Sequence, residues 1–422
     1  MKRTLPGAVV EFLGFSSEAS TQIDALRKFS SREWKGCLPW LSDAGIALYF
    51  LQKLKNADAT DVLPGAVLDN LELKFHANQE RTEYFASQFR IINQAFDRSG
   101  VGYAVVKGFS LAPQFCPDIF LRSFGDLDYL VDRESVPAAR TMIEQSGYSL
   151  QSSTETEFKF LGPPFHIPGC GVRGSLAIEM HLSLWSPELH RVSLAEPQFS
   201  RSRITTQAWQ GLIFPGLPTE DVFVLQAIHA FHHILTCWIR MSWLYEIGYF
   251  LSRRADDVLL WTRIRDRIGE DPVLREAVAL IAELAGRFFS VPLPSMVAEW
   301  SREIRPPVRV WIENYARTWA FGKNHPGDLG LFPTAKLVLF LHQQYVSDKK
   351  ELLRKRLLPV ASLPEITATM KKSPMIVRDS GWQRRRFMMR RTYFHLAGGL
   401  RYLCEIPRWR RLNKKIVREA RA

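Results

Sequence analysis

Two aspartates, Asp126 and Asp128, lie two residues apart in the stretch LRSFGDLDYLVD, which otherwise has the apolar pattern of a buried strand. Side chains at positions i and i+2 of a strand point to one face, so the two carboxylates share a face, while Leu127 and Tyr129 point to the other. Two carboxylates at that spacing repel each other and raise each other's pKa unless a positive charge compensates them. The pair therefore predicts either a sheet edge that faces water or a site that holds a cation.

Magnesium is the natural candidate for that cation. Mg²⁺ prefers oxygen ligands and typically binds through one or two carboxylates together with substrate phosphates. Ions held in this way activate an attacking oxygen and stabilise the leaving pyrophosphate of an in-line displacement. The neighbouring residues favour a phosphate site, because Gly125 lets the backbone approach a ligand closely and Lys107 and Arg122 carry charge that neutralises phosphate.

The pattern of the chain changes twice, from helical to strand-like and back. Apolar residues recur at three- and four-residue spacing before residue 99 and again after residue 215. Between them, VGYAVVKG, GDLDYLVD and RGSLAIEMHLSLW have the β-branched or alternating patterns of strands. This predicts an α+β fold in which a small mixed-sheet core is embedded between helical regions. The predicted divisions are residues 1–98 (helical N-terminal region), 99–215 (core), 216–348 (helical C-terminal lobe) and 349–422 (basic tail).

The tail from residue 349 onward carries all of the net positive charge. It holds 21 Lys and Arg against five acids, so that the remaining residues sum to −3 within a total of +13. Its prolines predict short helices and loops: Pro359, Pro364, Pro374 and Pro407. Arginines interleaved with aromatic residues have three interpretations, which we rank as a solvated or self-docking face, an anionic membrane surface, and a grip on nucleic acid.

Cysteine usage and hydropathy indicate the compartment. The five cysteines are scattered and form no CxxC pair, which argues against a disulfide framework or a cysteine zinc site and favours a reducing compartment. No stretch approaches the ~20 apolar residues of a membrane span, and the N-terminal apolar run is interrupted by Pro6, Gly7 and Glu11, unlike a signal peptide. We expect a cytoplasmic protein, with peripheral attachment to a membrane as the alternative.

The segment YAVVKGFSLAPQFCPDIFLRSFGDLDYLVDRESVPAARTMIEQSGY resembles the uncharacterised nucleotidyltransferase family of the polymerase-β-like nucleotidyltransferase superfamily. Members of that family have a strand ending in KG, then a strand with the pattern R-x-x-G-D-[ILV]-D, then a helix ending in GY. The corresponding residues are Lys107-Gly108, Arg122 with Gly125-Asp126-Leu127-Asp128, and Gly147-Tyr148. The resemblance covers roughly residues 38–359 and is firmest between 107 and 148.

Looser matches follow, and two of them depart from the family pattern. The family's DLH strand corresponds to Glu179-Met180-His181, and its His-rich helix and R-W-L-x-D-I segment correspond to residues 229–247. Glutamate stands at positions 179 and 246 where the family has aspartate. The wider superfamily also has a Gly-Ser pair at the start of its site, whereas here Phe109 follows Gly108 and Ser110 comes one place late.

The resemblance implies Mg²⁺-dependent transfer of a nucleoside monophosphate from an NTP, with ATP as the expected nucleotide, to a hydroxyl or phosphate acceptor with release of pyrophosphate. It implies three catalytic, metal-binding carboxylates, with Glu179 as the base beside the acceptor hydroxyl: Asp126, Asp128 and Glu179. It implies six nucleotide-binding residues: Lys107, Gly108, Ser110, Arg122, Gly125 and Arg240. A role in a bacterial biosynthetic pathway is a further expectation from the family.

Several alternatives stay open at this point. The substitutions at positions 109 and 179 suggest a degenerate transferase that binds a nucleotide or a partner without catalysis, and the basic tail suggests an RNA-modifying transferase. His181 is either a partner that orients a carboxylate or a merely buried histidine. The histidines of HAFHH (His229, His232 and His233) are structural residues or substrate contacts rather than zinc ligands, because the acid of an HExxH motif is absent. Arg240 and Glu246 either face the cleft or form a surface ion pair.

Overall fold

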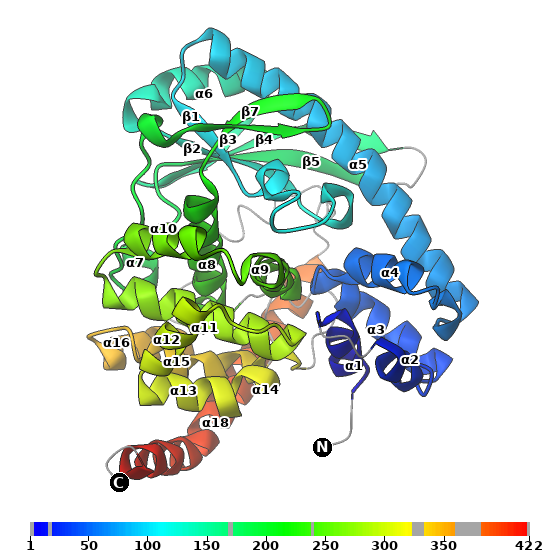
Figure 1. Ribbon diagram of the computed structural model, residues 1–422, viewed down its shortest axis with the longest axis vertical. Helices are drawn as coiled ribbons and strands as arrows, with labels where there is room; N and C mark the ends of the chain where they lie inside the picture. Colours follow the sequence, from blue (N-terminus) through cyan, green and yellow to red (C-terminus); the bar gives the residue numbers. More distant parts are fainter. Residues whose placement is uncertain are drawn as a thin grey trace.

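A mixed five-stranded sheet, flanked by helices, lies toward the top of the molecule in Figure 1, with most of the helices below it. The structure is a computed structural model that describes residues 4–15, 19–167, 172–237, 240–322, 333–358 and 381–419. Its architecture confirms the predicted mixed-sheet core between helical regions. No helix of the described part is long and apolar enough to span a membrane.

The sheet has the strand order β1-β2-β5-β4-β3. Its strands are β1 (Tyr103–Val106), β2 (Asp126–Val131), β3 (Ser149–Ser153), β4 (Glu157–Ile167) and β5 (Val172–His181). β2 and β5 pair in parallel, while β1 with β2, β5 with β4 and β4 with β3 pair antiparallel. A separate hairpin of β6 (Thr205–Trp209) and β7 (Leu212–Gly216) lies beside β1.

The sequence predicts β1, β2 and β5 but misses β3, β4 and the hairpin. β4 contains the run Gly162-Pro163-Pro164, which is typical of a turn because proline cannot donate to a strand ladder. The strand accommodates this run by a register shift between Leu161 and Pro164 in its pairing with β5.

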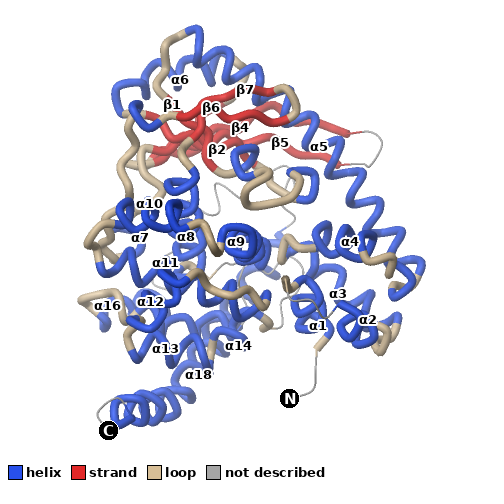
Figure 2. The backbone as a smooth tube through the Cα atoms, in the orientation of Figure 1, coloured by secondary structure: helices blue, strands red, loops and turns tan. Residues whose placement is uncertain are grey.

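Along the chain, helices come before, between and after the strands. Figure 2 shows the strands gathered in one part of the molecule and helices in all the rest. The first group is α1 (Leu5–Leu13), α2 (Ala19–Leu26), α3 (Ser31–Asp43), α4 (Ala47–Asn56) and α5 (Gly65–Arg98), and α6 (Val136–Gln145) and α7 (Pro187–His190) belong to the central region. The later helices are α8 (Thr219–Leu235), α9 (Met241–Arg254), α10 (Val258–Ile268), α11 (Pro272–Phe289), α12 (Ser295–Glu303), α13 (Pro306–Asn314), α14 (Ala316–Ala320), α15 (Leu339–His342), α16 (Lys349–Leu357) and α18 (Gly381–Glu419).

The long helix α5 packs its apolar side on the sheet face that carries Tyr129. Phe89 and Phe96 of α5 are fully buried, and their rings contact Tyr129 at centroid distances of 6.3 and 5.2 Å. Phe89 also contacts Phe109, which follows β1, at 4.8 Å, and Phe214 of β7 at 5.1 Å. Because this apolar face is closed by α5, the carboxylates of β2 lie on the opposite face, toward the helices that follow the sheet.

The basic tail differs from its prediction. Residues 381–419 form one continuous helix, α18, with Pro407 inside it, instead of short helices and loops. Proline in a helix removes one backbone hydrogen bond and clashes with the preceding turn. Here the rings of Tyr402 and Trp409, on either side of the proline, both stack on Phe340, at 4.5 and 4.8 Å, so packing against the lobe supports the helix on both sides of Pro407. The other three prolines of the tail lie outside the described residues.

Buried side chains from all four predicted regions belong to one continuous core, from Leu5 to Tyr402. The predicted boundaries at 99, 216 and 349 therefore stay a prediction about chain organisation. Within the described part, Cys37, Cys116, Cys237 and Cys404 are free thiols.

Phe89→Ala is expected to lower the free energy of unfolding by about 3–5 kcal/mol, because it removes a ring that is packed among three others. Ile91→Ala in the same helix is the matched control: Ile91 is 48% exposed, and its loss should stay below about 1 kcal/mol. Urea denaturation followed by circular dichroism measures both. Equal losses in the two variants would contradict the packing described for α5.

Candidate active site

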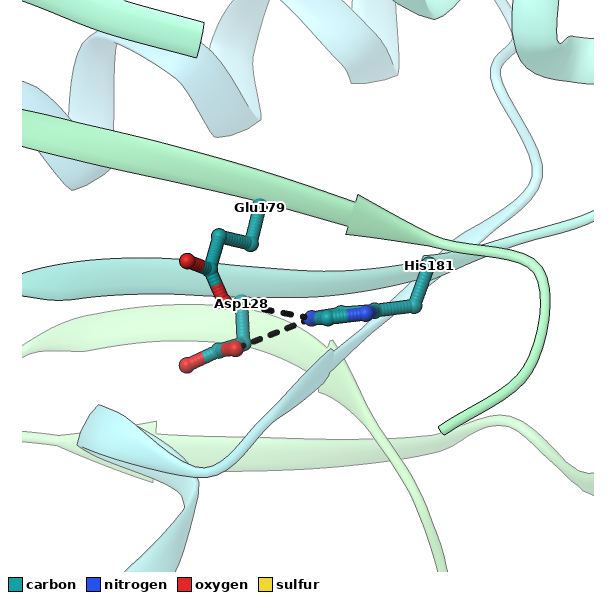
Figure 3. A group of neighbouring side chains, drawn as sticks. All are labelled: Asp128, Glu179 and His181. Carbon is teal, nitrogen blue, oxygen red and sulfur yellow. Dashed lines mark hydrogen bonds and ion pairs between the residues drawn. The ribbon is translucent and has the colours of Figure 1, made fainter. Parts of the chain in front are cut away.

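The parallel pairing of β2 with β5 brings two carboxylates together from distant parts of the sequence. Asp128 lies directly opposite Glu179, and Asp126 lies opposite Ala177. Potential ligand atoms of Asp128, Glu179 and His181 all lie within 4.8 Å of one another. Figure 3 shows the three side chains pointing toward one another. Asp128 and His181 are only 3% and 4% exposed. Two of the three predicted catalytic carboxylates, Asp128 and Glu179, therefore lie on neighbouring strands in one cluster with His181, whereas Asp126 is not among the described residues of that cluster.

Lys107 compensates the charge of Asp128. Its Nζ lies 2.7 Å from Asp128 Oδ1, and the lysine is buried at the end of β1. Burial acts to lower the pKa of Lys107, but the carboxylates of Asp128, Glu179 and Asp126 raise it above its usual range, so the ammonium stays charged. The same interaction, together with a hydrogen bond from His181, holds the pKa of Asp128 below its usual range despite burial.

The backbone at Lys107 is strained. Lys107 has φ +58° and ψ −158°, a region that residues other than glycine rarely adopt, and Gly108 follows at φ +44°. Such a conformation costs on the order of 1–3 kcal/mol and persists only where the surrounding structure enforces it. It turns the chain from β1 into the short 3₁₀ helix η2 (Gly108–Leu111) at the point where the lysine meets Asp128.

A second lysine, which the sequence analysis missed, pairs with Glu179. Lys159 of β4 forms an ion pair with the Glu179 carboxylate across the antiparallel β4–β5 pairing, in which the two residues are directly opposite. The alternation Glu157, Phe158, Lys159, Phe160 was an available signal for a strand that carries polar groups on one face. The prolines farther along β4 argue against a strand, and for that reason the alternation did not lead to a strand prediction.

Asp126 is the carboxylate of the three with which neither lysine forms an ion pair. Among the described residues, no hydrogen bond or ion pair joins Asp126 to a cation, in contrast to the pairs that Asp128 and Glu179 form. Burial and the neighbouring charges of Asp128 and Glu179 raise the pKa of Asp126 to about 6. A cation bound at this position would relieve that repulsion.

His181 contacts the cluster through one ring nitrogen. Its Nε2 lies 3.0 Å from Asp128 Oδ1 and 3.8 Å from Glu179 Oε2. This geometry agrees with the predicted role of His181 as a partner that orients a carboxylate, since metal-binding carboxylates are commonly held by such hydrogen bonds. The role itself stays a prediction.

Arg122 lies in a buried ion pair with Glu246. Its Nε is 3.0 Å from Glu246 Oε1, which also accepts a hydrogen bond of 3.2 Å from the Tyr49 hydroxyl. Glu246 is 2% exposed, so the alternative of a surface ion pair at this position is wrong. Asn78 of α5 donates to the Arg122 carbonyl at 3.2 Å and so anchors the segment that leads into β2. Arg122 thus joins α9 to the start of the Asp-bearing strand.

The other predicted nucleotide-binding residues lie around the same strand ends. Arg240 precedes α9 and donates from Nη1 to the Ser123 carbonyl at 3.0 Å. Gly125 immediately precedes β2, and a side chain there would meet no atom within 4 Å, so the space beside it is open. Ser110 is buried, and its hydroxyl donates to the Lys107 carbonyl at 2.8 Å. The hydroxyl therefore supports the turn after β1, while Phe109 packs into the core.

The histidines of α8 bond mainly to other histidines. His233 Nε2 lies 3.0 Å from His229 Nε2, and His232 Nδ1 lies 2.8 Å from Nε2 of His190. Burial, together with the positive charge of Lys107, lowers the pKa of His232 to about 4 and holds the pKa values of His229 and His233 well below their usual range. This face of α8 therefore presents neutral imidazoles to the side of the site where Lys107 lies.

Replacing each of the two neighbouring aspartates by asparagine is expected to change the free energy of unfolding in opposite directions, measured in the presence of a chelator. The raised pKa of Asp126 means that wild-type stability falls as pH rises through about 6. Asp126→Asn should therefore increase the free energy of unfolding by about 1 kcal/mol at pH 8 and have little effect near pH 4. Asp128→Asn should decrease it by about 3–5 kcal/mol at neutral pH, because the charge of Lys107 is left buried and unpaired.

Urea denaturation across this pH range measures both variants. Two variants that lose stability equally at pH 8 would contradict the charge distribution described for the cluster.

Comparison with known proteins gives one match. A family model described as uncharacterised nucleotidyltransferase matches residues 30–290, which is more than half of the chain. Comparisons with curated proteins and with solved structures find no match. The match includes the strands β1, β2 and β5, the lysine and carboxylates that they carry, and the histidine-bearing helix α8. On this evidence of sequence, the chain belongs to the uncharacterised nucleotidyltransferase family.

Proposed function

We propose that the protein transfers a nucleoside monophosphate from an NTP, with ATP as the first candidate, to a hydroxyl or phosphate acceptor and releases pyrophosphate. The observation that carries this proposal is the register of β2 against β5, which sets Asp128 opposite Glu179 with Asp126 two residues before it. Family membership supports the reaction class. The proposed site lies at the ends of β1, β2 and β5, beside the open space at Gly125.

The donor set fits a hard divalent cation such as Mg²⁺. The buried Asp128 and the partly exposed Glu179 on adjacent strands, with Asp126 as a third carboxylate whose pKa is raised, supply oxygen ligands of the kind that Mg²⁺ prefers. We assign Asp126, Asp128 and Glu179 as the residues that would hold it. When bound, the ion would neutralise the triphosphate charge and activate the acceptor oxygen. In this assignment His181 keeps Asp128 oriented through its hydrogen bond rather than serving as a ligand.

The lysines are proposed to bind the triphosphate. Lys107 and Lys159 each pair with one carboxylate of the cluster, so both ammonium groups stand where a polyphosphate would meet those carboxylates. A cation on the carboxylates would free the lysines to bind phosphate oxygens, which keeps the total charge of the site close to balanced. Arg240 is proposed to add charge from the α9 side, whereas the buried pair of Arg122 with Glu246 supports a positioning role for Arg122.

The acceptor is proposed to lie between Glu179 and α8. Glu179 is the carboxylate assigned to take the proton from an acceptor hydroxyl, as a general base within hydrogen-bond reach would do. Neutral imidazoles on α8 would donate and accept hydrogen bonds without adding charge. His232 is close enough to Glu179 for that carboxylate to affect the pKa of its imidazole. This arrangement suits a polar acceptor with hydroxyl groups.

A degenerate transferase is the second candidate, and two specific observations favour it. Two of the three carboxylates, Asp128 and Glu179, are already paired with a lysine. The Ser110 hydroxyl already donates a hydrogen bond to the Lys107 carbonyl. Such a protein would bind a nucleotide without transferring it. Both candidates predict nucleotide binding, so only turnover distinguishes them.

Asp128→Asn and Glu179→Gln are each expected to reduce pyrophosphate release by at least about 100-fold, because even residues outside a ligand set typically cost 10–100-fold. Pyrophosphate release is measured with each NTP and Mg²⁺ in the presence of a panel of hydroxyl and phosphate acceptors. Glu134→Gln, an exposed acid just after β2, is the matched control and should leave the rate unchanged.

Nucleotide binding by calorimetry separates the candidates. Tight binding that requires Mg²⁺, with no turnover for any NTP and acceptor, would support the degenerate transferase instead. Full activity in Asp128→Asn would contradict both the site and the proposed reaction.

A further inference from the structure

Helix α18 has two apolar faces, of which the described part of the chain covers only one. The inner face carries Phe394 and Tyr402, which are 8% and 3% exposed, and Trp409, whose ring stacks on Phe340. These residues follow one another at spacings of eight and seven, so they share one side of the helix. This side attaches α18 to the helical lobe, where it lies along α13 and the 3₁₀ helix η6 (Pro333–Val338).

The outer face carries an exposed apolar stripe. Its members are separated by four, three, four and three residues and are more than half exposed: Met389 73%, Tyr393 63%, Leu396 68%, Leu400 64% and Leu403 54%. At 100° per residue, the stripe is centred about half a turn away from Phe394 and Tyr402. It is about 20 Å long at 1.5 Å per residue. Within the described part of the chain these mainly apolar side chains are left largely uncovered, which is unusual for a contiguous set.

Cations lie on the same face at both ends of the stripe. Arg385 is exposed one turn before Met389, and Arg410, Arg411 and Lys414 are exposed beyond Leu403 on the continuation of that face. The helix as a whole has twelve Lys and Arg against Glu405 and Glu419. Its C-terminal part projects beyond the other helices of the lobe in Figure 1.

We propose that α18 docks the protein on an anionic lipid surface, with the stripe from Met389 to Leu403 inserted at the boundary between headgroups and acyl chains. An amphipathic helix with a basic polar face and exposed leucines binds in this manner, and its affinity combines apolar burial with attraction to anionic lipid. Each cation near such a surface adds about 1 kcal/mol of attraction. The long stems of the arginines and lysines let their charges reach the headgroups while the stripe is buried.

The charge of the helix argues for this occupant over a second copy of the chain. Two copies of α18 packed along the stripe would bring two strongly positive helices together, which costs free energy at physiological ionic strength. The stripe also spans only about two heptads, fewer than the three or four of a typical coiled coil.

Nucleic acid is a weaker candidate than lipid for a related reason. It would match the positive charge, but its phosphates and sugars would leave the leucines and the methionine of the stripe without an apolar partner. Lipid is the occupant that uses both the charge and the apolar stripe.

The test is vesicle flotation of the full chain. Vesicles of phosphatidylcholine mixed with phosphatidylserine are compared with vesicles of phosphatidylcholine alone. We expect binding to the anionic vesicles, weakened by salt, and at least about tenfold weaker binding to the neutral ones. The variant L396Q/L400Q/L403Q should lose at least about tenfold in partition to anionic vesicles, because three exposed leucines no longer insert. Glutamine keeps helix propensity close to that of leucine.

A matched control removes equally exposed apolar residues elsewhere. Ile213 of β7 and Leu259 of α10 are 73% and 72% exposed, so I213Q/L259Q should bind vesicles like the wild type. Circular dichroism and thermal unfolding confirm that both variants stay folded. The wild type failing to float with anionic vesicles would overturn the proposal, as would equal losses in the two variants.

Two further measurements test the rejected occupants. Light scattering after gel filtration that finds a dimer in the wild type and a monomer in L396Q/L400Q/L403Q would overturn the lipid proposal in favour of self-association. Salt-sensitive binding to an RNA oligonucleotide, with no vesicle binding, would overturn it in favour of nucleic acid. Pyrophosphate release is followed separately, so that the docking proposal fails or stands independently of the proposed reaction.

Discussion

Ion pairs between lysines and carboxylates allow the central strands of the sheet to pair as they do. Parallel pairing of β2 with β5 places Asp128 opposite Glu179, and a buried cluster of that kind is unfavourable without cations. The protein supplies Lys107 from one neighbouring strand and Lys159 from the other. Among the described residues Asp126 has no such ion pair, and burial together with the charges of Asp128 and Glu179 raises its pKa. Two of the three carboxylates are thus paired with a lysine, and the third is not.

The surrounding helices hold this cluster in place from both sides. On the apolar face of the sheet, Phe89 and Phe96 of α5 pack on Tyr129, which fixes the position of β2. On the polar side, the buried pair of Arg122 with Glu246 ties the entrance of β2 to α9. A buried ion pair contributes little net stability but has a definite geometry. Here the ion pair fixes the position of the segment that precedes the two aspartates.

Local sequence was sufficient for the parts of the site that lie within one strand or one turn. The i, i+2 spacing of Asp126 and Asp128 predicts that they share a face, and the alternation around Glu179 predicts a strand that carries an acid. The resemblance to the nucleotidyltransferase family predicts that these segments form one site, and the family match confirms the resemblance. Local patterns were insufficient for β4, where prolines hide the strand that carries Lys159, and for α18, where Pro407 suggests a break.

The mixed α and β character of the chain, the acidic strand and the concentration of positive charge in the tail follow from local sequence, because these features depend on residues close together along the chain. The fold set which cation faces which carboxylate, since Lys107 meets Asp128 and Lys159 meets Glu179 through pairing between strands. It also decided which face of α18 is covered. Packing on Phe340 buries Tyr402 and leaves Leu400 in water, and no property of the helix alone distinguishes these two apolar faces.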